Sequence, residues 1–243
     1  APDISRHKCP AAAPQRPERL IGMLRFDTII GDIPALLLGV PLTVGITVVA
    51  FAVGTIAALP IAVARIARVP IVSTLSIAWT EFFRTTPPLM HIVWAYYALP
   101  VIADIKLDAF TVVAGALACS TSAQMAEIFR GGITAVPRGQ SDAAQVLGLT
   151  SFQRLWWVVL PQTLRLILAP SCNTLVSLVK QSSLAAVIAM PEIMNRGWIL
   201  ASETFRPLEI LTFVALIYFV LTWPLVLLSA NLERRSSLAF KNE

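Results

Sequence analysis

Long apolar stretches, separated by short polar segments, dominate the chain. Residues 35–64 carry no charge, and at 1.5 Å rise per residue about 20 apolar residues already cross the hydrocarbon core of a bilayer. Further apolar segments cover residues 69–103, 109–126, 165–190 and 210–232. The pattern predicts an all-α membrane protein with about five transmembrane helices, which would place the two chain termini on opposite sides of the membrane.

Charged residues and prolines interrupt two of these segments. Glu81, Arg84 and the pair Pro87-Pro88 lie in the second segment, and Lys180 lies near the middle of the fourth. A charge at the centre of a transmembrane helix costs about 2.5–3.5 kcal/mol on insertion scales, so such side chains are expected to face a cavity or a partner. The interruptions therefore mark candidate functional positions.

Basic residues between the spans predict the orientation of the chain, because cytoplasmic loops of membrane proteins are enriched in arginine and lysine. One set of loops and the C-terminus carry Arg65, Arg68, Arg130, Arg138, Arg154, Arg165, Arg234, Arg235 and Lys241. The opposite loops carry Lys106, Arg196 and Arg206. Although the N-terminal tail is also basic, the comparison of the loops places the N-terminus outside and the C-terminus in the cytoplasm.

The same pattern divides the chain into three parts. Residues 1–33 form a polar, proline-rich tail without the apolar core of a signal peptide, and we expect it to be disordered or to lie at the membrane surface. Residues 34–235 form the transmembrane domain. Residues 236–243 form a short cytoplasmic tail.

Composition supports the membrane class and excludes others. The chain is 56% hydrophobic and 14% charged, with mean hydropathy +0.73, whereas soluble domains carry about 25% charged residues. The net charge of +5 does not indicate nucleic-acid binding, because the basic residues flank the apolar segments. Cys9, Cys119, Cys172, His7 and His91 show no metal-ligand spacing, and no phosphate-binding loop occurs. Any ATP would therefore be bound by another chain.

The polar segment at residues 136–161 predicts a short helix. Pro137 suits the first turn, the helix would run from Arg138 to Leu147, and Gly148 would end it as a C-terminal cap. The apolar face of this helix would comprise Ala143, Val146 and Leu147. Such a face is suited to contact with a partner in the cytoplasm.

A second amphipathic helix is expected after the turn. Thr150 or Ser151 would cap it and Pro161 would end it. Its apolar residues are Phe152, Leu155 and Trp156. The resulting helical hairpin would lie along the cytoplasmic face, and the alternative to a docking element is an interfacial amphipathic hairpin without a partner.

The hairpin sequence resembles a known motif. Asp142-Ala143-Ala144, three residues, Gly148, nine residues, then Val158 to Pro161 is similar to the EAA motif of permease subunits of bacterial ABC importers. In this chain Asp142 stands for the usual Glu and Val158 for the usual Ile. Ordered stretches at residues 81–87, 126–133, 136–140, 160–162 and 180–184 resemble the polar amino-acid permease family in particular. The resemblance covers roughly residues 35–235.

This resemblance implies a type I (MetI-like) permease fold in the bacterial cytoplasmic (inner) membrane, with a coupling loop at about 136–161. The implied ATPase-coupling residues are Pro137, Arg138, Asp142, Ala143, Ala144 and Gly148. The implied partners are an ABC ATP-binding subunit in two copies, a second permease chain that is identical or related, an extracytoplasmic amino-acid-binding protein and the lipid bilayer. The chain would have no catalytic residue, metal or cofactor, because ATP and magnesium would bind to the ATPase subunit.

The candidate residues of the substrate path are polar groups in the spans. They are Lys180, Gln181, Ser182, Ser120, Gln124, Glu81 and Arg84. Three of them depart from the family, which often has Asn at Ser120, Tyr at Gln124 and Asp at Gln181. These departures bear on which substrate the protein carries, and they do not change the class of protein that the motifs indicate.

Each of these polar groups also has a structural interpretation. Glu81 and Arg84, at spacing i and i+3, can pair with each other, as can Glu127 and Arg130 at a helix end. Lys180 either lines the translocation path, or extends its side chain toward the membrane surface (snorkels), or pairs with Glu81 or Glu127. Ser120 and Gln124 share a helix face and could contribute to the same cavity as Lys180. A stripe of Gly39, Thr43 and Thr47 favours close helix packing.

These observations predict the permease of an ATP-driven importer of a polar amino acid. Arg84 and Lys180, with Gln181 in place of an acid, favour an anionic or neutral cargo, with a slight lean to glutamate or aspartate. An ion-coupled secondary amino-acid transporter is the alternative, but such folds usually contain internal repeats, and five spans do not divide into equal halves. A membrane-embedded enzyme would need a nucleophile with a base, or a metal cluster, and the sequence offers neither.

Overall fold

The computed structural model describes residues 30–66 and 69–241, with side chains up to Arg234. Most of the expected N-terminal tail lies outside the described residues, as do Arg68 and the last two residues. The described chain is helical, with these elements: η2 (Ile30–Asp32), α2 (Ile33–Leu37), α3 (Val40–Ile66), α4 (Pro70–Thr85), α5 (Pro88–Ala103), α6 (Ala109–Ala135), α7 (Arg138–Val146), α8 (Ser151–Arg154), a π-helical segment η3 (Leu155–Val159), α9 (Leu160–Gln181), η4 (Ser182–Ile188), α10 (Ile193–Thr204) and α11 (Pro207–Lys241).

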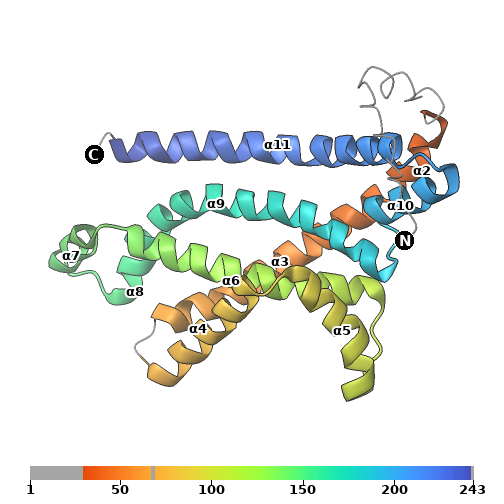
Figure 1. Ribbon diagram of the computed structural model, residues 1–243. Helices are drawn as coiled ribbons and strands as arrows, with labels where there is room; N and C mark the ends of the chain where they lie inside the picture. Colours follow the sequence, from red (N-terminus) through yellow and green to blue (C-terminus); the bar gives the residue numbers. More distant parts are fainter. Residues whose placement is uncertain (1–29, 67–68, 242–243) are drawn as a thin grey trace, which may run out of the picture.

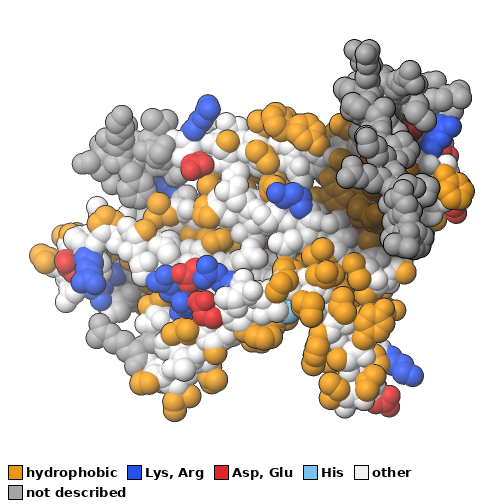
Figure 2. Space-filling view, in the orientation of Figure 1, with side chains coloured by type: hydrophobic (Ala, Val, Ile, Leu, Met, Phe, Trp, Pro, Cys, Tyr) orange, Lys and Arg blue, Asp and Glu red, His pale blue; other side chains and the backbone are white. Residues whose placement is uncertain are grey.

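The helices confirm a membrane protein with four to five spans. Within the described part, the helical stretches long and apolar enough to cross a bilayer are Ile33–Ile66, Ala109–Ala135, Ser151–Ile188 and Pro207–Arg234. The helix Pro88–Ala103 is apolar but shorter. Large apolar side chains remain on the outside, including Val101 at 84% exposure and Ile71 at 74%, and Figure 2 shows such side chains over α5. A surface of this kind is suited to contact with lipid.

The expectation of one interrupted helix over residues 69–103 is wrong, because this segment forms two helices, α4 and α5. Thr86 and Pro87 between them are extended, with ψ of 134° and 132°. The ring of a proline disfavours the helical conformation of the residue before it. The consecutive prolines Pro87 and Pro88 therefore end α4 and allow α5 to begin in a new direction (Figure 1).

Two other expected boundaries are also wrong. The third span extends to Ala135 rather than residue 126, so Glu127 and Arg130 lie inside α6. Pro161 does not end a helix, because α8, η3 and α9 form one continuous helical run. The N–H group of Leu160 donates to the carbonyl group of Leu155 across a π turn, and this wider turn accommodates a proline that cannot donate a backbone hydrogen bond.

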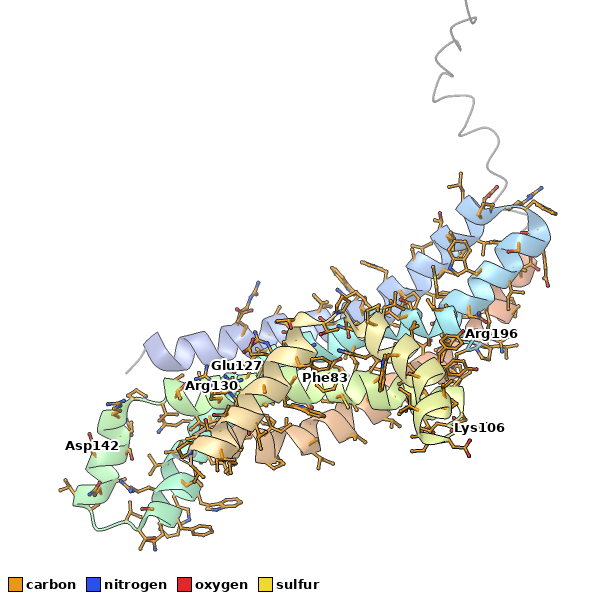
Figure 3. The ribbon with its side chains drawn as sticks, turned by 60° about the horizontal axis from the view of Figure 1, so that its bottom comes forward. Phe83, Lys106, Glu127, Arg130, Asp142 and Arg196 are labelled. Carbon is orange, nitrogen blue, oxygen red and sulfur yellow. The ribbon has the colours of Figure 1, made fainter. Side chains whose placement is uncertain are left out.

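The loops group at two ends of the molecule as the basic residues predicted. Figure 1 shows α7, α8 and the C-terminal end of α11 at one end, and α2 and α10 at the other. In Figure 3, Asp142 lies at the first end, whereas Lys106 and Arg196 lie toward the second. The first end is the one expected in the cytoplasm.

The core of the bundle is the contact between α3 and α6. Ile46, Ala50 and Leu117 are fully buried there. A Cβ atom added to Gly54 would lie 2.6 Å from the Cβ atom of Thr121 and 2.8 Å from the carbonyl oxygen of Ala118. Small residues allow the backbones of membrane helices to approach this closely.

The predicted stripe of Gly39, Thr43 and Thr47 also packs closely. A Cβ atom on Gly39 would lie 2.5 Å from the backbone nitrogen of Ile193. Thr43 and Thr47 are buried, and the hydroxyl group of Thr47 donates to the carbonyl group of Thr43 at 2.8 Å. The stripe therefore fixes the start of α3 against α10.

We predict that Gly54→Ala destabilises the protein, because the added methyl group meets backbone as well as side-chain atoms of α6. Overpacking of this kind costs about 1–3 kcal/mol. Thermal unfolding of the detergent-solubilised protein should show a lower midpoint. The matched control is Gly115→Ala on α6, where an added Cβ atom has nothing within 4 Å. Equal midpoints for the two variants would contradict the close α3–α6 contact.

Candidate functional site

The turn of the polar hairpin has the predicted glycine cap. Gly148 adopts φ of +79°, a conformation that costs glycine little and other residues more. Around it, the N–H groups of Leu147 and Leu149 donate to the carbonyl groups of Ala143 and Ala144, both at 3.1 Å. These bonds satisfy the last carbonyl groups of α7, so the chain reverses direction at this glycine.

The second helix of the hairpin has its own cap. The hydroxyl group of Thr150 accepts from the backbone of Gln153 at 3.3 Å, and the side-chain carbonyl of Gln153 accepts from the backbone of Thr150 at 2.9 Å. This reciprocal pair is a capping box. The guanidinium group of Arg154 then donates to the side chain of Gln145 at 2.9 Å, which joins α8 to α7. The hairpin is a defined structural unit.

The hairpin presents apolar side chains at the end of the molecule. Val146 is 88% exposed and Leu147 is 81% exposed, whereas Ala144 is only 4% exposed. The other residues predicted for ATPase coupling, Pro137, Arg138, Asp142, Ala143 and Gly148, are exposed on the same hairpin. The structure thus brings the predicted coupling residues together, with Ala144 facing inward. Exposed large apolar residues rimmed by polar ones are typical of a protein interaction site.

An ion cluster joins α3 and α6 in the half of the molecule nearest the hairpin. Glu127 accepts hydrogen bonds from Arg130, including two from Nε at 3.2 Å, and its Oε2 lies 3.1 Å from Nη1 of Arg65. Figure 3 shows Glu127 and Arg130 side by side on α6, and Figure 2 shows basic and acidic side chains gathered near this region. The Glu127–Arg130 pair was predicted from its spacing. Arg65 was missed, because no local spacing signal links residues so far apart in the sequence.

The pair Glu81 and Arg84 is weaker. Nη1 of Arg84 lies 3.8 Å from Oε1 of Glu81, and the two side chains are 42% and 53% exposed. The predicted pairing is therefore present on α4. It lies away from Lys180, so these two candidates do not share a site with the others.

Lys180 lies near the end of α9 and toward the C-terminal end of the apolar helical stretch Ser151–Ile188 rather than at its middle, because that stretch begins well before residue 165. It lines an open surface cavity of about 320 Å³ between α9, η4, α10 and α11, and its side chain is exposed. The lining residues are Lys180, Ser183, Met194, Leu211, Val214, Ala215 and Tyr218. Among the described residues, Lys180 forms no ion pair with Glu81 or Glu127. The alternative that Lys180 pairs with either acid is therefore wrong.

The neighbours of Lys180 point elsewhere. Ser182 is fully buried and its hydroxyl group donates to the carbonyl group of Val179 at 2.7 Å. The Oε1 atom of Gln181 is buried and has no hydrogen-bond partner in the described part of the chain. Only Lys180 of these three candidates lines the cavity.

Ser120 and Gln124 are not among the residues that line the Lys180 cavity. Ser120 is 1% exposed and its Oγ atom lies 3.2 Å from Nδ1 of His91 on α5. Through Ser120 this face of α6 meets His91 of α5. Helical spacing alone does not say which neighbour a face meets.

A buried carboxyl group beside the cavity was missed. Glu192 is fully buried and caps α10 by accepting from the backbone N–H groups of Met194 at 2.9 Å and Asn195 at 2.8 Å. The hydroxyl group of Tyr218 donates to its Oε2 atom at 2.7 Å. Burial raises the pKa of Glu192, and these hydrogen bonds act in the opposite direction. The sequence signal was an acid directly before a helix.

We predict that Glu127→Gln lowers stability more than Glu81→Gln. The first change removes the carboxylate that accepts hydrogen bonds from Arg130 and forms an ion pair with the mostly buried Arg65, and a hydrogen bond between charged groups contributes about 1.5–3 kcal/mol. The second removes an exposed pair that contributes about 0–1 kcal/mol. Thermal unfolding in detergent measures both. A larger loss for Glu81→Gln would show that the cluster does not hold α3 to α6.

Residues 50–238 match the family described as binding-protein-dependent transport system inner membrane component. The chain is 30% identical to the arginine transport system permease protein ArtQ of Bacillus subtilis over 212 residues, covering 87% of this chain and 97% of the relative. It is 32% identical to the glutamine transport system permease protein GlnP of Escherichia coli over 204 residues, covering 84% and 93%.

Further likenesses agree with these two. The octopine transport system permease protein OccM of Rhizobium meliloti is 34% identical over 215 residues, covering 82% of this chain and 84% of the relative. A crystal structure of an amino acid ABC transporter with histidines gives a TM-score of 0.82 at 31% identity, covering 87% of this chain and 99% of that one. The MetNI methionine ABC transporter shares the fold, with a TM-score of 0.70 at 19% identity over 85% and 98% of the two chains.

Proposed function

This chain belongs to the family of binding-protein-dependent inner-membrane transport components, and from that premise we infer that the cavity beside Lys180 receives its cargo. As a member, the chain is the non-catalytic, multi-pass inner-membrane permease of an ATP-driven polar amino-acid importer, with the ATPase on a separate subunit. The alternative of an ion-coupled secondary transporter is therefore set aside. What remains to be proposed is the cargo and the assembly.

The cargo is a polar amino acid with a neutral or anionic side chain, of which glutamine and glutamate are the nearest examples. The observation that carries this proposal is the charge of the cavity, where Lys180 is the one charged group among the lining residues. A cationic side chain would meet a like charge there and no carboxylate in the wall, and like-charge contacts are strongly unfavourable. Gln181, which replaces the frequent acid of the family, supports the same choice. The named relatives transport arginine, glutamine and octopine.

The assembly contains two copies of an ATP-binding subunit, a second permease chain and an extracytoplasmic binding protein. The exposed Val146 and Leu147 on a capped, rigid hairpin support docking of the ATP-binding subunit at this end. ATP and magnesium would act on that subunit, and residues 34–235 would form the permease domain. An unpartnered interfacial hairpin would not require so well-defined a turn.

Movement of the hairpin would pass into the membrane through α6. Only Val136 and Pro137 separate α6 from α7, so a displacement of the hairpin displaces the end of α6. The ion cluster of Arg65, Glu127 and Arg130 ties this end of α6 to α3. The two helices would then move together, which is how packed helices transmit a rigid-body motion.

We predict that Leu147→Asp abolishes co-purification of the ATP-binding subunit without unfolding the permease, because Leu147 is exposed and a charge there disturbs only an apolar contact. The measurement is affinity purification of the tagged chain from its native membrane in mild detergent. The matched control is Phe205→Asp, which adds the same charge at an 89% exposed site at the opposite end. An ATPase retained equally by both variants would contradict docking at the hairpin.

We predict that Lys180→Gln raises the apparent KM for uptake of glutamine or glutamate by about tenfold, the effect of one charge-assisted contact, while the ATPase still co-purifies. Uptake by reconstituted importer in proteoliposomes measures this change. Lys106→Gln, which removes an exposed lysine at the outer end, is the matched control. Unchanged kinetics in Lys180→Gln would remove this cavity from the transport path.

A further inference from the structure

The last turn of α4 carries two charged side chains at membrane depth. The helix begins near the cytoplasmic end of the bundle (Figure 1). Its 16 residues rise about 24 Å at 1.5 Å per residue, which is less than the roughly 30 Å of the hydrocarbon core. In Figure 3, Phe83 lies between Asp142 at the hairpin and Lys106 at the outer end. Glu81 and Arg84, which flank Phe83 in the sequence, therefore lie inside the membrane.

The backbone leaves the helical conformation at the same depth. Thr86 and Pro87 are extended. In a continuing helix, the carbonyl groups of Phe83 and Arg84 would accept from the N–H groups of residues 87 and 88, but both of these are prolines and carry none. Non-helical backbone at membrane depth occurs where it is buried in protein or lines a water-filled cavity. Contact with lipid therefore does not suit this end of α4.

Glu81 and Arg84 do not satisfy each other within the chain. Nη1 of Arg84 lies 3.8 Å from Oε1 of Glu81, and both side chains are about half-exposed. A charge-assisted hydrogen bond is usually about 2.7–2.9 Å long. Neither side chain has a second partner among the ion pairs of the described residues. Because a charge inside the bilayer faces a partner or a cavity, both groups are available to a partner outside the chain.

The two charges lie on opposite flanks of one line of α4. At 100° per residue, Glu81 lies about 40° to one side of Ile77 and Arg84 about 20° to the other. We call Ile77, Glu81 and Arg84 the α4 seam, and all three are exposed. If two copies are related by a two-fold axis along the membrane normal, the left flank of one seam faces the right flank of the other. The carboxylate of each copy then faces the guanidinium group of its partner.

We propose that a second copy of this chain packs on the α4 seam, with Glu81 of each copy paired to Arg84 of the other. The interface is isologous, because one surface patch meets the same patch of the partner. This inference rests on the proposed function, because it takes the second permease chain of that assembly to be a second copy.

The residues around the seam favour a protein partner over a water-filled path. Phe82 and Met90 are large, apolar and exposed, as is Ile77 on the seam itself. Aromatic residues, methionine and arginine are enriched in protein interfaces, whereas a path filled with water is expected to have polar walls. The seam also carries both charges, so it is complementary to a copy of itself and requires no different chain.

Cross-linking of the assembled importer, permease with its ATPase, tests where the second copy lies. The three native cysteines are replaced by alanine, and Ile77→Cys is introduced on the seam. Oxidation in the membrane is expected to give a disulfide-linked permease dimer. The matched control is Leu75→Cys, which lies on the same helix about 160° away from the seam. It should remain monomeric although Leu75 is more exposed than Ile77, at 67% against 43%.

Charge variants separate pairing between copies from pairing within one chain. A copy with Glu81→Arg carries two positive charges on its seam, and a copy with Arg84→Glu carries two negative charges. Expressed alone, each should give about tenfold less Ile77→Cys dimer, because like charges oppose association. Expressed together with tags of different size, they should form mixed dimers at the yield of the unaltered seam. The control Glu203→Arg, at an exposed acid on α10, should leave the yield unchanged.

The rescue is specific to a contact between copies, because pairing within one chain is broken in both variants. Equal cross-linking at Ile77→Cys and Leu75→Cys, or no rescue in the mixed expression, would overturn the inference. If the charge variants do not reach the membrane, the comparison of the two cysteine variants decides.

Co-purification of differently tagged copies distinguishes this inference from the proposed function. Two tags in one importer without an Ile77→Cys dimer would leave the assembly intact and show that the copies meet elsewhere. A single tag accompanied by a different permease chain would agree with the proposed function and overturn the inference. A permease that co-purifies with the ATPase but with no second permease would contradict the proposed assembly itself.

Discussion

The close contact between α3 and α6 is the constraint on which the other parts of the molecule depend. Gly54 lets the two backbones approach each other. Nearer the hairpin, the ion pair between Arg65 and Glu127 connects the same two helices a second time. The helices α4, α5 and α9 all pack on α6, and α6 leads directly into the hairpin. In the proposed assembly, a displacement of the hairpin would therefore reach the centre of the bundle, since packed helices do not deform continuously.

The polar residues of the chain serve this arrangement at separate places. The hairpin offers exposed apolar side chains on a polar, capped turn. The ion cluster of Arg65, Glu127 and Arg130 has its charges paired and half-buried. The cavity at the other end of α9 keeps Lys180 without an acidic partner among its lining residues. A paired charge stabilises a helix contact, whereas an unpaired charge in a cavity is available to a ligand.

Much of the fold could be predicted from local sequence. The apolar segments identified the spans, and Gly148 and Thr150 identified the turn, because caps depend on residues next to one another. The errors share one cause, which is that local sequence does not show where a helix continues or which neighbour it packs against. Pro161 looked like a helix end but is accommodated by a π turn, and Lys180 looked central because the start of its helix was placed too late. The contact of Ser120 with His91 was not predicted, because a helix face is visible in the sequence but its packing partner is not.

The sequence by itself determined the class, the spans, the hairpin and the polar residues that carry charge into the membrane, because hydrophobic length and capping act over a few residues. Tertiary structure alone decided which of those residues meet. Arg65 reaches Glu127 from another helix, and Tyr218 reaches the carboxyl group of Glu192, and neither contact has a signal in the local sequence. Such contacts depend on how the helices cross, which is set by close packing between residues distant in the chain.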